Sequence, residues 1–462
     1  MSKIRLFIDF GSTFTKAVAF DLDKEELLAR TQAPSTVDHD VAAGLDSALA
    51  EMKKIIPLSE TEISRAVATS SAAGGLSMLC IGLVPEYTTE AGRLAALGAG
   101  AKVTGTYSYE LSVSETEEIK KAKPDIILLT GGTDGGNKDV ITHNAEILAK
   151  TGAAAGHIIV AGNKSASFRI SEIFENAGIS AHLTENVMPE LGKINFEPVN
   201  KLIREIFLGH IIHAKGIARI DSIIDGVLMP TPSAVLEAAK LIALGIPGEM
   251  NGMGELLLTD VGGATTDVYS IAAGYPMQEG TVMVGLPEPY EKRTVEGDLG
   301  LYHNLDVLTD IARADGAAVG GEPEPDEETL MSLRSARSVP GTPKQEKLQM
   351  MLTRLAVKAA VERHAGSIER LVTPGGMIRR QRGKDLTGLK LVIGAGGPVS
   401  FSPDPRRVLE GAAGGSENSV ALKPEAPNFF IDSKYILFAI GLLSRDEPQK
   451  ALNIAKKYLK QV

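Results

Sequence analysis

Hydrophobic residues along this chain alternate between short strand-like runs and longer stretches with helical spacing. An apolar run at residues 4–10 leads into a glycine turn, and further runs follow at residues 15–20 and near 27–32. Residues 41–55 then carry apolar side chains at helical spacing. The pattern predicts a β-β-β-α opening, whereas a Rossmann domain opens with β-α-β.

Strand-like and helix-like segments continue to alternate between residues 66 and 177. This alternation favours parallel strands joined by helical crossovers. Residues 198–246 are mainly helical in pattern, and residues 255–271 form a second strand-turn-strand unit. Residues 315–347 are rich in Gly, Pro, Glu and Ser, which predicts an exposed insertion or mobile loop. A strand at 389–393 and a helix at 436–443 close the chain.

The first strand-turn-strand unit has the residues that a nucleotide triphosphate requires. Asp9 ends the strand, where its carboxylate can hold a metal-bound water. The glycine turn after it supplies backbone N–H donors for phosphate. The candidate phosphate ligands are Gly11, Ser12, Thr13, Thr15 and Lys16. The alternative is an ordinary glycine hairpin with no ligand.

The second unit, LLTDVGGATTD at residues 257–267, repeats this order about 250 residues later. If the two turns face each other, Asp9 and Asp260 converge on one Mg²⁺, which they would hold through water. Asp267 either supports the site from behind or caps the turn, and we favour the structural role. The candidate phosphate ligands here are Gly262, Gly263, Ala264, Thr265 and Thr266.

A third unit, LVIGAGGPV at residues 391–399, runs from an apolar strand into a glycine-rich turn. Gly394, Gly396 and Gly397 would let an adenine ring or a ribose lie against the backbone. A strand-to-helix loop without a ligand is the alternative.

Together these units resemble the phosphate-1, phosphate-2 and adenosine motifs of the actin, hexokinase and heat-shock ATPase superfamily. The resemblance implies an α/β protein with two ribonuclease-H-like (actin-like ATPase) lobes, MgATP between them, and an additional α/β or helical middle region. We expect the first lobe at residues 1–125 and the second at 226–462. Residues 126–225 form the middle region, either part of lobe one or an insertion.

A closer resemblance covers nearly the whole chain. The segments IDFGSTFTKAVAFD, LLTGGTDGGN, LTDVGGATTDVYS, RTVEGDLG and IGAGGPV are similar to those of the glutamate (methylaspartate) mutase accessory family GlmL/MutL, which shares only a name with the DNA mismatch-repair protein. This resemblance implies a slow MgATP-dependent ATPase that reactivates an adenosylcobalamin-dependent mutase in a chaperone-like role. A small-molecule kinase of the same fold and an actin-like nucleotide-dependent scaffold are the alternatives.

Several other polar segments allow more than one interpretation. Glu296 could orient an attacking water, although Glu296 and Asp298 in a polar turn more often cap a helix. The loop at residues 131–137 could line the ATP cleft or bind a second ligand. The basic run Arg379, Arg380, Arg382 and Lys384 is interpreted as a solvated loop.

Composition restricts the class of partner. The formal net charge of −10 argues against a nucleic-acid-binding protein. No apolar run reaches the length of a membrane span and no secretory signal is evident, so we expect a cytoplasmic protein without a membrane partner. Cys80, the single cysteine, lies in an apolar segment and is predicted to be a core residue. The sequence leaves a homo-oligomer open.

Overall fold

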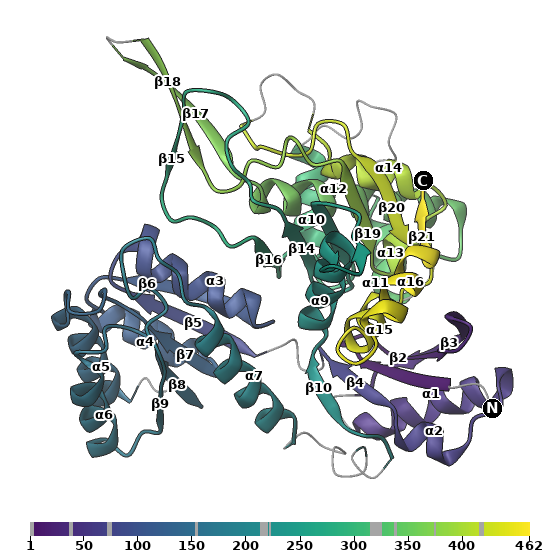
Figure 1. The fold of residues 1–462 in the computed structure, drawn as a ribbon, viewed down its shortest axis with the longest axis horizontal. Coiled ribbons are helices and arrows are strands. Elements are labelled where there is room, and N and C mark those ends of the chain that lie inside the picture. Colours follow the sequence, from purple (N-terminus) through teal and green to yellow (C-terminus); the bar gives the residue numbers. More distant parts are fainter. Residues whose placement is uncertain are drawn as a thin grey trace. The chain divides into compact units, whose positions relative to one another are not determined.

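The computed structural model describes residues 4–36, 40–71, 76–152, 156–212, 220, 223–314, 326–336, 340–373, 376–414 and 420–462. The chain forms two compact units (Figure 1). The first contains Met1–Ala72, Ala214–Val284 and Glu288–Val462, and the second contains Ala73–His213 and Gly285–Pro287. The sequence-based boundaries near residues 125 and 225 stay a prediction.

The first unit begins with a five-stranded sheet. Its strands are β1 (Ile4–Phe10), β2 (Phe14–Asp21), β3 (Glu26–Pro34), β4 (Val67–Ser70) and β10 (Val227–Pro230). The order is β10-β4-β1-β2-β3, with β1, β2 and β3 antiparallel and β4 and β10 parallel to β1. Helices α1 (Val41–Ile55) and α2 (Glu60–Ser64) follow β3, and the Asp40 carboxylate caps α1 by accepting from the Ala42 N–H.

A second sheet in the same unit repeats this topology. Its strands are β13 (Leu256–Val261), β14 (Thr266–Ile271), β16 (Glu291–Glu296), β19 (Leu391–Ala395), β20 (Asn428–Asp432) and β21 (Leu459–Gln461). The order is β16-β14-β13-β19-β20-β21. Three antiparallel strands again lie on one side of the sheet, and β19 and β20 run parallel to β13. Both sheets therefore have the ribonuclease-H-like strand order, which confirms the predicted two-lobed α/β fold.

The two lobes share a hydrophobic core. Helices α9 (Thr231–Leu244), α15 (Leu437–Leu443) and α16 (Pro448–Tyr458) contribute side chains to it, and so do both sheets, including Phe7 and Phe20 from the first and Leu258 from the second. Burial of this continuous apolar surface holds the lobes together. The short hairpin of β11 (Gly245–Ile246) and β12 (Met250–Asn251) connects α9 to the second sheet.

The other face of the second sheet is covered by a separate helical layer. The layer consists of α10 (Leu305–Ala314), α11 (Glu327–Ala336), α12 (Pro343–His364), α13 (Gly397–Ser400), α14 (Pro405–Leu409) and the 3₁₀ turn η4 (Glu410–Ala412). Thr342 and Gln345 form a capping box at the start of α12. Residues 315–347, predicted to be a loop, are helical over 327–336 and from 343 onward. Residues 315–325 and 337–339 lie outside the described residues.

A small three-stranded sheet projects from the second lobe (Figure 1). It contains β15 (Thr281–Val284), β17 (Ser367–Thr373) and β18 (Gly376–Arg382) in the order β15-β18-β17. Here the solvated-loop interpretation of the basic run is wrong, because Arg379, Arg380 and Arg382 belong to β18. Lys384 is buried, which lowers its pKa to about 7, and its ammonium donates to the Tyr290 carbonyl at 2.8 Å.

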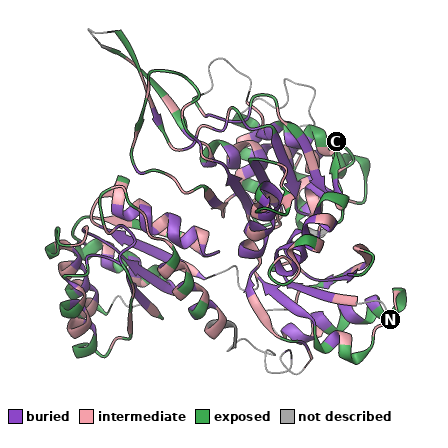
Figure 2. Ribbon diagram, viewed as in Figure 1, coloured by how far each residue is buried: buried purple, intermediate pink, exposed green. Residues whose placement is uncertain are grey.

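The second unit is a doubly wound parallel sheet in the order β6-β5-β7-β8-β9. Apolar clusters cover both of its faces, as a parallel sheet requires (Figure 2). Its elements are β5 (Ser77–Gly82), the π-helix η2 (Pro85–Thr89), α3 (Glu90–Gly98), β6 (Lys102–Ser108), α4 (Val113–Ala122), β7 (Ile126–Leu129), α5 (Asp139–Thr151), β8 (His157–Val160), α6 (Ser167–Asn176), β9 (Ala181–Leu183) and α7 (Glu197–Ile212). It supplies the additional α/β region that was predicted.

Cys80 in β5 is fully buried, and burial raises its thiol pKa to about 12, which fits the predicted core role. Among the described residues, we find no helix that combines the length and the apolar character needed to cross a lipid bilayer.

Candidate functional site

The two glycine turns have the same local structure. At the first, the Gly11 N–H donates to the Phe14 carbonyl at 3.1 Å, and at the second the Gly262 N–H donates to the Thr265 carbonyl at 2.9 Å. A Cβ on Gly11 would lie 2.7 Å from the Phe14 oxygen, so this position requires glycine. Each lobe thus presents an equivalent turn directly after its central strand.

These turns lie close together in the first unit. The Thr13 hydroxyl oxygen is 3.1 Å from the position that a Cβ on Gly263 would occupy. The third motif is adjacent as well, because a Cβ on Gly396 would lie 2.8 Å from the Asp260 carboxylate. The structure therefore brings together three motifs that are far apart in the sequence.

Asp9 is buried in a fully polar shell. Its Oδ2 accepts from the Lys16 ammonium at 2.7 Å. Its Oδ1 accepts from the Thr231 hydroxyl at 2.6 Å and from the Thr69 hydroxyl at 3.2 Å. Three side-chain hydrogen bonds therefore fix the carboxylate at the end of β1.

Lys16 connects this acid to the second lobe. Its ammonium donates to the Tyr435 hydroxyl at 3.2 Å and lies 4.4 Å from the centre of that ring. Burial disfavours the charged form, but the Asp9 carboxylate and the Tyr435 hydroxyl outweigh burial and raise the Lys16 pKa above its ordinary value. Lys16 is thus a permanent cation between the lobes.

Asp260 has a different environment. Burial and, after it, the neighbouring Asp267 carboxylate raise its pKa to about 7 against the opposing charge of Lys16. Charges on Asp432 and Asp9 act in the same direction as Asp267. Asp260 therefore changes its charge close to neutral pH.

Asp432, at the end of β20, is a further buried acid. Burial raises its pKa to about 6, although its carboxylate accepts from the N–H groups of Ile436 at 2.6 Å and Leu437 at 2.9 Å. These bonds tie Asp432 to the start of α15. Asp432 is buried, whereas Asp260 keeps part of its surface accessible.

Asp267 has a structural partner. The Arg293 guanidinium on β16 donates to its Oδ1 through Nε at 2.9 Å and through a second nitrogen at 2.6 Å. The Thr265 hydroxyl donates to its other oxygen at 3.1 Å. Asp267 thus joins the second turn to the neighbouring strand, which is the structural role that we favoured.

Glu296 ends β16 directly beside the second turn, opposite Thr266. Its carboxylate accepts from the Arg363 guanidinium at 2.8 Å, and Asp298 accepts from the same guanidinium at 2.7 Å. The helix-cap interpretation of these acids is wrong, because both bind Arg363 and the next helix begins only at Leu305. A catalytic role for Glu296 stays a prediction.

Not all predicted phosphate ligands face the same way. Ser12 is exposed, and Thr13, Gly262, Gly263, Ala264 and Thr265 keep part of their surface accessible. Thr15 and Thr266 are buried, the first against Gly44 of α1 and the second donating to the Leu299 carbonyl at 2.7 Å. Their side chains support the turns from within the lobes.

The three glycines of the third motif differ in what surrounds them. The space beside Gly394 is filled by Val399 and Leu409, whereas a side chain on Gly397 would meet no atom within 4 Å. Gly396 has a positive φ of 87° and lies against Asp260. Gly396 and Gly397 are therefore the glycines that leave backbone open near the acids.

The donor set fits Mg²⁺ bound together with a nucleotide. Among the described residues, no cluster of three or more His, Cys, Asp or Glu side chains could form a closed metal cage. Mg²⁺ commonly uses one or two carboxylates, several waters and phosphate oxygens. Asp9 and Asp260 could provide the carboxylates, while a triphosphate would complete the set.

Sequence reasoning missed Thr231, Tyr435, Asp432 and Arg293. The first two contact Asp9 and Lys16 from more than 200 residues away, and no local pattern indicates this. Tyr435 offered one weak signal in the sequence, because it directly precedes the predicted helix at 436–443. In the structure it adopts a positive φ of 55°.

The loop at residues 131–137 belongs to the second unit. Asn163 holds it in place, accepting from the Gly135 N–H at 3.2 Å and donating to the Gly136 and Asn137 carbonyls. Asn186 also donates to the Gly132 carbonyl at 3.0 Å. Whether the loop lines an ATP site stays a prediction.

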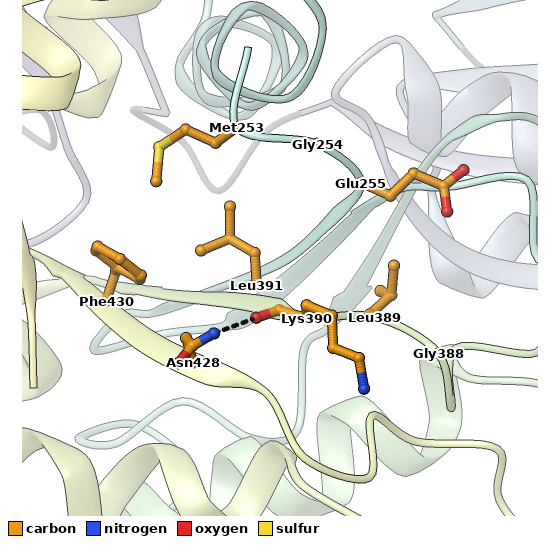
Figure 3. Close-up of a pocket in the computed structure, with 9 residues that line it drawn as sticks. All are labelled: Met253, Gly254, Glu255, Gly388, Leu389, Lys390, Leu391, Asn428 and Phe430. Atoms are coloured by element: carbon orange, nitrogen blue, oxygen red, sulfur yellow. Dashed lines mark hydrogen bonds between the residues drawn. The ribbon is translucent and has the colours of Figure 1, made fainter.

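A surface pocket of about 380 Å³ lies elsewhere in the second lobe, at the amino ends of β13, β19 and β20 (Figure 3). The side chains of Met253, Leu391 and Phe430 form its apolar wall. Asp260 and Gly396 follow the opposite ends of these strands, so the pocket is separate from the candidate site.

Comparison with known proteins agrees with this description. Residues 5–459 match the family model described as MutL protein. The chain is 45% identical over 467 residues to Protein MutL of Clostridium tetanomorphum, covering 99% of both chains. Weaker likenesses include the activator of 2-hydroxyisocaproyl-CoA dehydratase from Clostridium difficile with bound ADPNP (10% identity, TM-score 0.34, 98% and 96% of the two chains). Another is gluconate kinase from Lactobacillus acidophilus (11% identity, TM-score 0.34, 100% and 93%).

The two structural likenesses are too distant to add to the argument, and the fold assignment rests on the strand order. The family match spans nearly the whole sequence and includes both hairpins and the third glycine turn. It confirms the resemblance on which the sequence analysis drew: the chain belongs to the MutL protein family.

Proposed function

We propose that this protein binds MgATP between the two glycine turns and hydrolyses it slowly. The observation that best supports the proposal is the pair of equivalent hairpins, one from each lobe, with the Thr13 hydroxyl next to Gly263 and with Asp9 close enough to affect the pKa of Asp260. A triphosphate chain needs donors and cations on opposite sides, and two facing turns provide them.

In this proposal each residue has a defined task. The backbone N–H groups of residues 12–13 and 263–265 bind phosphate oxygens, since those of Gly11 and Gly262 close their own turns, and Asp9 and Asp260 orient waters on Mg²⁺. Lys16 places a positive charge beside the phosphates. The metal ion, when bound, neutralises charge on the transferred phosphoryl group. Gly396 and Gly397 leave room for the adenosine.

The proposed role of hydrolysis is to reactivate an adenosylcobalamin-dependent mutase of the glutamate mutase type. Full-length similarity to Protein MutL supports an accessory role of this kind. Nucleotide binding across two lobes can favour one arrangement of the lobes over another, and a partner that binds the two arrangements differently would be held or released with the nucleotide state.

ATP hydrolysis by the purified protein tests the site directly. Asp9→Asn and Asp260→Asn should each lower kcat at least about a hundredfold, because each removes a carboxylate from the metal and phosphate site. Asp446→Asn, at an exposed acid on the same unit, is the matched control and should retain full activity. Normal hydrolysis by both site variants would refute the proposal, and strong stimulation by a small hydroxyl acceptor would favour a kinase.

The role of Glu296 has its own matched control, since Glu296 and Asp298 share Arg363. If Glu296 orients the attacking water, Glu296→Gln should lower kcat about a hundredfold with little change in KM. Asp298→Asn loses a similar contact with Arg363 and should change kcat less than about threefold. Equal effects of the two variants would assign Glu296 a structural role.

The partner is tested with glutamate mutase that has been inactivated by cyanocobalamin. Addition of this protein with MgATP should release cyanocobalamin into the filtrate and restore mutase activity once adenosylcobalamin is supplied. Asp260→Asn should fail to do so. If the protein hydrolyses ATP but releases no cobalamin, the proposed hydrolytic site would be supported and the proposed reactivation role would be refuted.

A further inference from the structure

The projecting sheet of β15, β17 and β18, called the arm below, has an exposed face that combines apolar and basic side chains. In the register of β17 and β18, Val372 lies opposite Met377 and Arg370 lies opposite Arg379. Residues two apart in a strand share a face, so all four side chains project from one side of the arm. We call this side the arginine face.

The arginine face is open to solvent at its tip. Val372 is 88% exposed and Met377 is 61% exposed, and Figure 2 shows the arm as mainly exposed. A sheet of two or three strands is marginally stable unless one face is packed. Exposed apolar side chains clustered on such an element indicate a surface that another molecule covers.

Among the residues that the structure describes, no carboxylate forms an ion pair with the two arginines of this face. Arg370 and Arg379 are directly opposite each other, and like charges in this position repel. The Nε of Arg379 is buried without a hydrogen-bond partner among the described residues. On the other face of the arm, Arg380 is paired with Glu369, which lies opposite it, at 3.8 Å. Carboxylates that pair with the arginine face would therefore come from outside the arm.

A second copy of this chain can supply them. The chain has 58 acidic and 48 basic residues, for a net charge of −10, whereas the segment 367–382 has four arginines and one glutamate. The remainder of the chain is therefore more acidic than the whole. Two arms would repel each other, so the arm of one copy would bind the acidic body of another.

We propose that the arginine face docks on an acidic surface of a second copy of this chain and that it mediates self-association. Reciprocal docking of two arms closes a twofold dimer, in which each arm is covered by the partner. The contact needs no nucleotide, and it is independent of the ATPase proposal.

Sedimentation velocity without nucleotide tests the proposal. Wild-type protein should dimerise across micromolar concentrations, and raising the salt from about 50 to 500 mM should weaken the dimer because arginine–carboxylate contacts are screened. Arg370→Gln/Arg379→Gln should raise the dimer Kd at least about tenfold. Met377→Ser should raise it by about threefold or more.

The opposite face of the arm provides matched controls. Arg380→Gln/Arg382→Gln removes the same charge from the arm, here from β18 alone, and Ile378→Ser removes a similar side chain, yet both should leave the Kd within about twofold of wild type. Circular dichroism and thermal melting of each variant separate a folding defect from a binding defect. A monomeric wild-type protein, or equal effects of the two sets of variants, would overturn the proposal.

A crosslink can identify the receiving surface. Because Cys80 is buried, Met377→Cys introduces the accessible thiol to which a photo-crosslinker can be attached. The expected product joins two chains and links residue 377 to an acid-rich peptide. Crosslinks found only within one chain would contradict the proposal, and so would arginine-face variants that keep the dimer but lose binding to glutamate mutase.

Discussion

The two glycine turns have equivalent backbone hydrogen bonds, but the residues opposite their acids carry different charges. In the first hairpin the cross-strand partner of Asp9 is Lys16, and in the second the partner of Asp260 is Asp267. One position is therefore an acid–base pair and the other an acid–acid pair. The first acid accepts a hydrogen bond from its lysine, whereas burial and the charge of Asp267 raise the pKa of the second acid to about 7.

The same fold can thus give two similar strands separate tasks. Arg293 is paired with Asp267, and among the described residues no cation is hydrogen-bonded to Asp260. An incoming Mg²⁺ would meet one acid that is hydrogen-bonded to a lysine and one whose raised pKa means that it must release a proton near neutral pH. Variants of Lys16, Asp260 and the two turn glycines test this difference.

The largest effect should come from Lys16→Met. It leaves Asp9 as a buried carboxylate without its cation, and removing one partner of a buried pair costs about 3–5 kcal/mol in the free energy of unfolding. The Thr69 and Thr231 hydroxyls still donate to Asp9, so the loss of stability should lie toward the lower end of this range. Urea denaturation measures it. Asp9→Asn/Lys16→Met removes both charges and should recover much of the loss; if it does not, the pair is not what stabilises the first hairpin.

A smaller effect of opposite sign is expected from Asp260→Asn. The raised pKa means that ionising Asp260 in the folded state costs free energy, and Asn avoids this cost. The folded pKa of about 7 lies above the ordinary 3.8, so this acid's contribution to stability falls as pH rises from about 4 to 7 and is constant above. The rise in pKa corresponds to about 4 kcal/mol if fully expressed. Because Asp260 keeps part of its surface accessible, solvent screening lowers this value, and the variant should gain about 2 kcal/mol near pH 8 and nothing near pH 4.

Thermal melting of wild type and Asp260→Asn across this pH range, without nucleotide, measures the difference. Asp446→Asn controls for the loss of a negative charge elsewhere. If the difference in melting temperature between wild type and variant does not change with pH, Asp260 is ionised throughout, and the expected difference between the two acids is contradicted.

The smallest effect should distinguish the turns themselves. A Cβ on Gly11 would lie 2.7 Å from the Phe14 oxygen, whereas a Cβ on Gly262 would lie 3.1 Å from the Thr265 oxygen. Gly11→Ala should therefore cost about 1–2 kcal/mol and Gly262→Ala less than about 1 kcal/mol in unfolding experiments. Equal losses would mean that the turns tolerate a side chain equally and that their difference lies in charge alone.

Much of the fold could be predicted from local pattern. The bounds of β1 and α1 agree with the predicted segments 4–10 and 41–55, because buried strands and amphipathic helices differ in hydrophobic period. Other elements gave no such signal. Val227–Pro230 lies within a stretch that looked helical, and it becomes a strand because it pairs with β4. The arm was missed for a related reason, since its strands are held by pairing and not by burial of a periodic face.

The two hairpins, their acids and the family could be recognised from the sequence, because each hairpin is a local structure formed by consecutive residues. Which polar groups come into contact depends on the tertiary structure. Thr231 donates to Asp9, Lys16 donates to Tyr435, and Arg293 pairs with Asp267. These contacts depend on strand order and on the packing of α9 and α15 between the sheets. A carboxyl group's pKa follows from burial and neighbouring charge, and both exist only once the lobes have packed together.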